Sequence, residues 1–274
     1  MEYIKNRFYQ KAIKCSAEYQ RIRKEYGDKV IAQVNIDQVL SGQKGIPALV
    51  TDTSNLDANE GIRFRGYTLP ELREKLPKLT PEGEPLPEGL FYLMLIGEIP
   101  EKEDVMNISR DWATRSHVPQ HVFDVIDAIP KIARPMTFFS TAILSMATES
   151  VFQKAYRAGV HKKFYWDFMY EDVMNLIARL PRIAAYIYRK LYHNGHHIDP
   201  NPNLDWAGNL AYMMGFDNLE VKRLLRLYMV IHADHEGGNV SAHTTHLVGS
   251  ALSNAYYSFA DRKSTRLNSS HRIR

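Results

Sequence analysis

I-H-A-D-H-E-G-G-N-V-S-A-H-T-T-H, residues 231–246, has the densest polar chemistry in this chain, and apolar helical sequence lies on both sides of it. On a helix, with about 100° of rotation per residue, positions three and four apart face the same way. The Gly237-Gly238 pair costs a continuous helix roughly 1 kcal/mol per glycine. We therefore expect either a helix break there or the close approach of a ligand to the backbone. An unbroken helix would align five polar side chains on one stripe: His232, His235, Asn239, His243 and His246.

Three interpretations fit this cluster of histidines. In the first, several of them are hydrogen-bonded core groups at a contact between helices. In the second, they bind a metal: His243 and His246 are an i, i+3 pair, and His235-Glu236 begins like the zinc motif H-E-x-x-H, but Asn239 occupies the position of the second ligand. In the third, imidazoles and an amide donate hydrogen bonds to the carboxylates of an anionic substrate. Spacing alone leaves all three open.

The bulk properties exclude several classes of protein. The 274 residues suffice for one large domain or two smaller ones, and no window of about 18 consecutive apolar residues predicts a membrane span. Cys15 is the single cysteine, so no intramolecular disulfide forms, and a reducing compartment is expected. The net charge of +4 resides wholly in the tail, so we expect no nucleic-acid or anionic-membrane partner. The tail has one acidic residue, Asp261, against Arg262, Lys263, Arg266, Arg272 and Arg274.

Proline, glycine and capping residues divide most of the chain into helical segments. Apolar residues recur at helical spacing over residues 4–26, and Gly27 offers a stop. Residues 68–71, T-L-P-E, have the pattern of a capping box, and Pro77 closes the helix that they open. The same signals predict a buried helix over 90–96 that ends at Gly97, and helices after Pro100, Pro119 and Pro135.

The remaining segments are also mainly helical. The longest periodic segment, 167–192, contains Pro181, which predicts a kink or a break. Helical patterns cover 219–232 and 240–259 on either side of the histidine stretch. Alternation of apolar and polar residues over 32–37 predicts one short strand, and a turn at 41–45 follows it. Because little other β signal is present, we predict an all-α protein.

Residues 232–250, H-A-D-H-E-G-G-N-V-S-A-H-T-T-H-L-V-G-S, resemble the signature segment of eukaryotic citrate synthases. Three more segments resemble that family in the same order: 59–67, 85–91 and 165–189. The similarity runs from about Tyr19 to Ala260. It implies the multi-helix large domain of the citrate synthase fold, a homodimer, and a location in the mitochondrial matrix, although no presequence is evident.

The resemblance also implies a reaction and its site. Citrate synthases condense acetyl-CoA with oxaloacetate to citrate and CoA in the tricarboxylic acid cycle, and they need neither a cofactor nor a metal. An aspartate removes a methyl proton, one histidine donates to the thioester oxygen, and another polarises the oxaloacetate ketone. His235 and Asn239 match oxaloacetate-binding positions of the family. Lys44 and Lys162 match positions that contact CoA, where arginine is usual, and a solvated loop lysine is an equally good interpretation of each.

The resemblance stops after Ala260, where the family continues into Gly-Pro-Leu-His-Gly and later supplies its catalytic histidines, catalytic aspartate and carboxylate-binding arginines. By counting, His271 falls at the first catalytic histidine, but none of its neighbours match, so we interpret it as a coincidence. We therefore expect a C-terminally incomplete enzyme with no catalytic residue retained. Residues 1–260 would be part of the large domain, without the small domain and last helices, and residues 261–274 a foreign or disordered tail.

Three alternatives compete with an acetyl-CoA-dependent synthase. A 2-methylcitrate synthase would take propionyl-CoA, and no acyl-pocket residue evident in the sequence separates the two. A non-catalytic fragment would still pair through its apolar helices with full-length subunits. A metal-binding helical protein would use the histidine stripe.

Overall fold

The structure is a computed structural model, and it describes residues 2–42, 45–47, 50–57, 59–236 and 240–260. The chain divides into two compact units, Met1–Asp52 and Thr53–Arg274, called here the first and second units. The domain boundary predicted at residue 260 borders a segment outside the described residues, and it stays a prediction. No helix in the described part of the chain is long and apolar enough to span a membrane.

The first unit contains the predicted N-terminal helix, α1 (Glu2–Tyr26), and a short helix, α2 (Ile36–Leu40). Helix α1 ends where predicted, because the Gly27 amide donates to the Arg23 carbonyl (3.0 Å) and a Cβ at Gly27 would lie only 2.4 Å from that oxygen. The basic residues Arg23 and Lys24 in its last turn suit the negative end of the helix dipole.

The strand predicted over residues 32–37 is wrong, because this segment leads into α2 instead. Asn35 caps that helix: its side chain accepts from the Gln38 amide (2.9 Å), and the Gln38 side chain accepts from the Asn35 amide (3.1 Å). This reciprocal capping box satisfies two backbone donors at once, and it outweighs a short alternation of apolar and polar residues.

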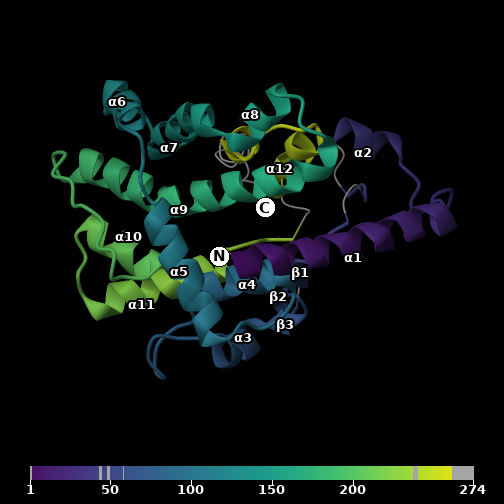
Figure 1. The fold of residues 1–274 in the computed structure, drawn as a ribbon, viewed down its shortest axis with the longest axis horizontal. Helices are drawn as coiled ribbons and strands as arrows, with labels where there is room; N and C mark the ends of the chain where they lie inside the picture. Colours follow the sequence, from purple (N-terminus) through teal and green to yellow (C-terminus); the bar gives the residue numbers. More distant parts are fainter. Residues whose placement is uncertain (1, 43–44, 48–49, 58, 237–239, 261–274) are drawn as a thin grey trace. The chain divides into compact units, whose positions relative to one another are not determined.

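The second unit is mainly helical, as Figure 1 shows, so the all-α class is confirmed with one small sheet added. Its first half comprises β1 (Ser54–Asp57), β2 (Gly61–Phe64), β3 (Tyr67–Thr68), α3 (Leu69–Lys75), α4 (Pro87–Ile96), α5 (Lys102–Arg115), α6 (Gln120–Ala128) and α7 (Pro135–Ser145). Its second half comprises η1 (Met146–Glu149), α8 (Val151–Arg157), η2 (Lys162–Phe164), α9 (Tyr165–Tyr192), α10 (Trp206–Met214), α11 (Leu219–Ile231) and α12 (Val240–Ser250).

The sheet β1-β2-β3 is antiparallel, with Ser54 opposite Phe64 and Phe64 opposite Tyr67. The prediction of little β structure missed it because the strands are only two to four residues long. Its turn was the available signal: Arg65 and Gly66 both have positive φ (49° and 87°), as a two-residue hairpin with a primed turn requires.

Most predicted helix ends are confirmed, because they depend on local chemistry. Thr68 and Glu71 form the predicted capping box, with the Thr68 amide donating to the Glu71 carboxylate (2.8 Å). The buried helix α4 ends at Gly97, whose φ of 91° is the left-handed geometry that favours glycine there. The helices predicted after Pro100, Pro119 and Pro135 are α5, α6 and α7.

Helix α9 is the centre of the second unit and runs without interruption through Pro181, so the predicted break does not occur. Both halves of α9 are packed, since α5, α7, α8 and α10 all contact it. Figure 1 shows α7 and α8 along one side of α9, with α10 along the other. This packing offsets the backbone hydrogen bond that a proline removes from a helix.

The helix predicted over residues 240–259 is interrupted. Helix α12 ends at Ser250, Leu252 has a φ of 64°, and residues 255–260 form a separate helical segment. Asn254 caps this second segment, because its side chain accepts from the Tyr257 amide (3.0 Å). A helix start of this kind competes with continuation through the same residues.

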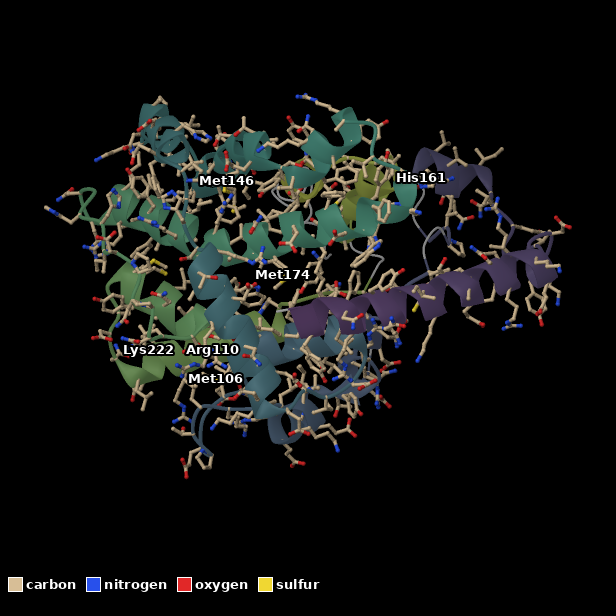
Figure 2. All side chains as sticks on the ribbon, viewed as in Figure 1. Met106, Arg110, Met146, His161, Met174 and Lys222 are labelled. Carbon is tan, nitrogen blue, oxygen red and sulfur yellow. The ribbon has the colours of Figure 1, made fainter. Side chains whose placement is uncertain are left out.

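Two of the buried clusters in the described part of the second unit join elements that are distant in the sequence. The larger joins α6, α7 and α9 to residues 255–260, and it includes Met146, labelled in Figure 2. The smaller packs the sheet, α3 and α4 against the end of α11, and therefore positions the segment that follows α11. Its fully buried members are Phe64, Leu72, Leu76, Leu90, Leu93 and Val230.

Candidate functional site

The histidine stretch does not form one continuous helix. Helix α11 ends at Ile231, His232 is its C-cap, and α12 begins at Val240. The helix break is therefore confirmed, but it comes before the glycine pair, and Gly237-Gly238 lie outside the described residues. The predicted single stripe of histidines is wrong, because residues 232–236 form a loop between the two helices. We call this segment the 232–236 loop.

Asp234 ties the 232–236 loop to the first strand of the sheet. Its Oδ2 atom accepts hydrogen bonds from Thr53 Oγ1 (3.1 Å) and Ser54 Oγ (2.8 Å). Its Oδ1 atom accepts from the amide of His235 (2.8 Å). One carboxylate thus fixes both the course of the loop and its distance from β1, since charged acceptors form the stronger hydrogen bonds.

Glu236 supplies a second attachment on the other side of His235. Its amide donates to Ser54 Oγ (2.8 Å), and its carboxylate accepts from the amide of Leu56 (3.1 Å). Glu236 has a φ of 46°, a left-handed conformation that a side chain other than glycine rarely adopts. Such a conformation persists when its surroundings hold it, and these two hydrogen bonds do so.

His235 lies between these attachments, and its side chain is exposed. Within the described residues, no hydrogen bond occupies its imidazole. Its backbone is fixed while its ring is available, which suits an imidazole that hydrogen-bonds a ligand.

The other histidines have different surroundings. His232 lies next to the helix carbonyls, with Nδ1 3.0 Å from the Tyr228 oxygen, and its ring stacks on the Tyr228 ring at 4.1 Å. His243 and His246 do not belong to the 232–236 loop, because they lie on α12, which begins at Val240. No group of three His, Cys, Asp or Glu side chains in the described segments is arranged to hold a metal ion.

The remaining predicted site residues are only partly described. Asn239, Lys44 and His271 lie outside the described residues. Lys162 is exposed at the start of η2, directly before α9. His161, labelled in Figure 2, shapes this turn, because its Nδ1 accepts from the Lys163 amide (3.3 Å). An exposed lysine at a turn is compatible with both interpretations of Lys162.

Sequence inspection missed Thr53, Ser54 and Arg65. Ser54 and Asp234 are 180 positions apart, and no local spacing announces such a contact. Arg65 connects Thr53 with α4: its amide donates to the Thr53 carbonyl (2.9 Å), and its guanidinium Nε donates to the Met94 carbonyl (3.1 Å) on α4. The unusual R-F-R-G pattern before Tyr67 was the available signal for Arg65.

A buried charge cluster anchors α11, which leads into the 232–236 loop. The guanidinium of Arg226 on α11 donates to both carboxylate oxygens of Asp205 (3.1 and 2.7 Å) before α10. Glu88 on α4 is fully buried beside this pair and accepts from the Trp206 amide (3.0 Å). Burial, followed by the charge of Asp205, raises the pKa of Glu88 to about 7.

A separate cavity of about 240 Å³ lies beside α6, α9 and α10 and contains none of the predicted site residues. Two arginines line it, but both have partners already. Arg189 donates to two backbone carbonyls (2.5 and 3.3 Å), and Arg182 lies 3.7 Å from Asp199. Because this cavity contains no site residue predicted from the sequence, it is not the candidate site.

The chain is similar to known proteins of one family. Residues 42–261 match the family model described as citrate synthase, C-terminal domain. Citrate synthase 4, mitochondrial, of Arabidopsis thaliana is 49% identical over 240 residues, which are 88% of this chain and 51% of that protein. The mitochondrial citrate synthase of Saccharomyces cerevisiae is 48% identical over 257 residues, 94% of this chain and 54% of that protein.

A solved structure supports the same relationship. The crystal structure of citrate synthase from Pyrobaculum aerophilum matches with a TM-score of 0.72 and 25% identity, covering 86% of this chain and 57% of that one. The chain spans about half the length of the curated relatives it matches. Because the family model covers most of the residues, including the 232–236 loop, the chain belongs to the citrate synthase family.

Proposed function

We propose that this chain belongs to an enzyme that condenses acetyl-CoA with oxaloacetate, giving citrate and CoA, as a homodimer in the mitochondrial matrix. The observation that carries the proposal is an exposed His235 on a loop fixed at both ends, within a segment of family sequence. The relatives named mitochondrial citrate synthases support the compartment and the reaction. Acetyl-CoA would enter as a substrate, and membership of the family supports a reaction without a cofactor.

His235 and Asn239 would bind oxaloacetate. An imidazole donates to a carboxylate or keto oxygen, and an amide both donates and accepts, so together they suit a substrate with several oxygen acceptors. The 232–236 loop supports this role for His235, since a fixed backbone reduces the freedom that binding must remove. Asn239 lies outside the described residues, and its role rests on the resemblance alone.

Lys162 and Lys44 would contact the phosphates of CoA. The exposure of Lys162 at the turn before α9 supports access by a large anionic ligand. Lysine offers a point charge in place of the bidentate fork of arginine, so each contact would be weaker than in relatives that carry arginine. Lys44 lies outside the described residues.

The chemistry needs groups that the matched residues do not supply. A carboxylate must remove a methyl proton next to the thioester, and a donor must stabilise the developing enolate. By resemblance, these groups and the arginines that hold the carboxylates have no counterpart within residues 1–260, and His271 matches by position only. We therefore expect the 274-residue polypeptide, tested by itself, to bind substrate without turning it over.

The test combines calorimetry with an activity assay on the 274-residue polypeptide. Oxaloacetate and acetyl-CoA are titrated in turn, and thiol release is followed with both present. The proposal expects heat from oxaloacetate binding and no thiol release. Absence of oxaloacetate binding would remove the binding role, and turnover comparable to that of a full-length enzyme would contradict the missing chemistry. Replacing acetyl-CoA with propionyl-CoA distinguishes the 2-methylcitrate alternative.

A second candidate function is a fragment that pairs with full-length subunits without catalysis. Large apolar side chains are exposed at the end of α12 and in the residues after it: Leu247 (63%), Leu252 (52%) and Tyr257 (40%). Surface of this kind favours a protein partner. If the fragment pairs in this way, it will co-elute with full-length enzyme and lower its activity, and separate elution would refute the pairing.

A further inference from the structure

Among the described residues, the side chain of Ser54 contacts both neighbours of His235, Asp234 and Glu236. Its Oγ–H donates to Asp234 Oδ2 (2.8 Å), and the same oxygen accepts from the Glu236 amide (2.8 Å). A hydroxyl can do both, because it carries one donor hydrogen and two acceptor lone pairs. Ser54 is buried (5% exposed) at the first position of β1.

The two contacts of Ser54 lie on either side of His235 in the sequence. Asp234 and Glu236 are the neighbours of His235, so fixing both leaves its backbone little freedom. In the same network, the Thr53 hydroxyl donates to Asp234 and the Leu56 amide donates to Glu236. Ser54 therefore links the contacts of Asp234 with β1 and those of Glu236 with β1 into one hydrogen-bond network.

We infer that Ser54 is a positioning residue: its hydroxyl holds the 232–236 loop, and with it the backbone from which the imidazole of His235 reaches the ligand. The part of this inference that concerns ligand binding rests on the proposed function, whereas the part that concerns the loop does not. Without the hydroxyl, Asp234 Oδ2 keeps its bond from Thr53, but the Glu236 amide loses its acceptor. Of the two hydrogen bonds that hold the left-handed Glu236, the one from the Leu56 amide would remain, so this conformation would relax more readily.

The inference assigns the positioning role to the Ser54 hydroxyl, so the test compares variants with and without a hydroxyl at this position. Ser54→Ala removes the hydroxyl, and Ser54→Thr retains it on a side chain that suits a strand. Ser116→Ala is the control, because it also removes a part-buried serine hydroxyl, one that donates to the Ala113 carbonyl (2.7 Å) after α5. Thermal melts of all variants show whether a change in the loop reflects global unfolding.

The first measurement is amide hydrogen exchange on the full 274-residue chain. In the native loop, the amides of His235, Glu236 and Leu56 donate to side-chain oxygens. In Ser54→Ala, we expect exchange of the Glu236 amide to become about tenfold faster, with smaller increases at the other two. Ser54→Thr and Ser116→Ala should match wild type. Unchanged exchange in Ser54→Ala would overturn the inference.

The second measurement follows the imidazole of His235 by NMR while oxaloacetate is added. Wild type and Ser54→Thr should show a ligand-induced shift, and Ser54→Ala should need about tenfold more oxaloacetate for the same shift. An undiminished response in Ser54→Ala would overturn the positioning role. If wild type shows no response, the proposed oxaloacetate site fails, and exchange alone decides whether Ser54 holds the loop.

Discussion

Glu88 is a buried carboxyl group whose ionisation costs the native protein stability. It lies on α4 with the Trp206 amide as a donor and the Asp205 carboxylate nearby, and its pKa is raised from 4.5 to about 7. Below pH 4.5, both the native and unfolded states hold the proton. Between pH 4.5 and 7 only the native state holds it, so the stability of the wild type falls as pH rises through this window.

Glu88→Gln removes this titration while keeping an oxygen acceptor for the Trp206 amide. The variant should gain stability relative to wild type as pH rises from about 4.5 to 7, by up to about 3 kcal/mol, and the difference should be constant above that range. Urea unfolding of both proteins at pH 5, 6, 7 and 8 measures it. A stability difference that does not change with pH would contradict the raised pKa.

Arg226 makes an ion pair of a different kind from those on the surface. It and Asp205 are both buried, with side chains 6% and 2% exposed, so each neutralises a charge that has no access to water. Arg226→Gln should cost about 3–5 kcal/mol of unfolding free energy, because Asp205 would remain as an unpaired buried charge.

Arg110 provides the matched control for Arg226. Arg110, labelled in Figure 2, pairs with Glu103 at 2.7 Å, but the two side chains are 64% and 75% exposed. Arg110→Gln should therefore cost less than about 1 kcal/mol. Denaturant melts of the two variants test the contrast, and equal losses would show that burial does not govern the strength of these pairs.

At the scale of elements, the sequence predicted helices whose ends are set by nearby residues. The capping box at Thr68, the stop at Gly97 and the proline-led starts of α5, α6 and α7 all depend on a few adjacent positions. The errors have local causes too. Residues 32–37 were assigned to a strand because alternation was weighed above the cap at Asn35, and the small sheet has strands too short for a periodic signal.

Asn254 caps the helical segment 255–260 and so separates it from α12. Its Oδ1 accepts from the Tyr257 amide (3.0 Å), and its Nδ2 donates to Gln153 (3.1 Å) on α8. Asn254→Ala should destabilise the protein by about 1–2 kcal/mol, through loss of the cap and of this contact. Asn254→Asp retains the capping oxygen and should lose less. Thermal melts compare the three proteins, and equal stability of the alanine variant would contradict the capping role.

At the scale of the whole molecule, the sequence predicted the family but not the geometry of the 232–236 loop. The family was evident, because its signature over residues 232–250 is contiguous. The loop geometry was not, because it depends on Ser54 and Asp234, 180 positions apart. Contacts of that length follow from packing of the sheet against α11 and α4, which no short window of sequence contains.

The same distinction explains the incorrect stripe of histidines. Helical spacing aligned His235 with His243 and His246, yet α11 ends at Ile231, before either glycine. The hydrogen bonds that the carboxylates of Asp234 and Glu236 accept from β1 compete with helix continuation and form instead. The histidines consequently have separate environments: His235 lies in a loop held on both sides by contacts with β1, whereas His243 and His246 lie on α12.

The measurement that tests this account most directly compares oxaloacetate binding by His235→Gln and His246→Gln with binding by the unaltered chain. His246 is the matched control, because it is exposed on α12 and outside the 232–236 loop. Calorimetry should show about tenfold weaker binding for His235→Gln, because a ligand oxygen would lose its donor, and no change for His246→Gln. Equal binding by both variants would contradict the proposal that the 232–236 loop binds oxaloacetate.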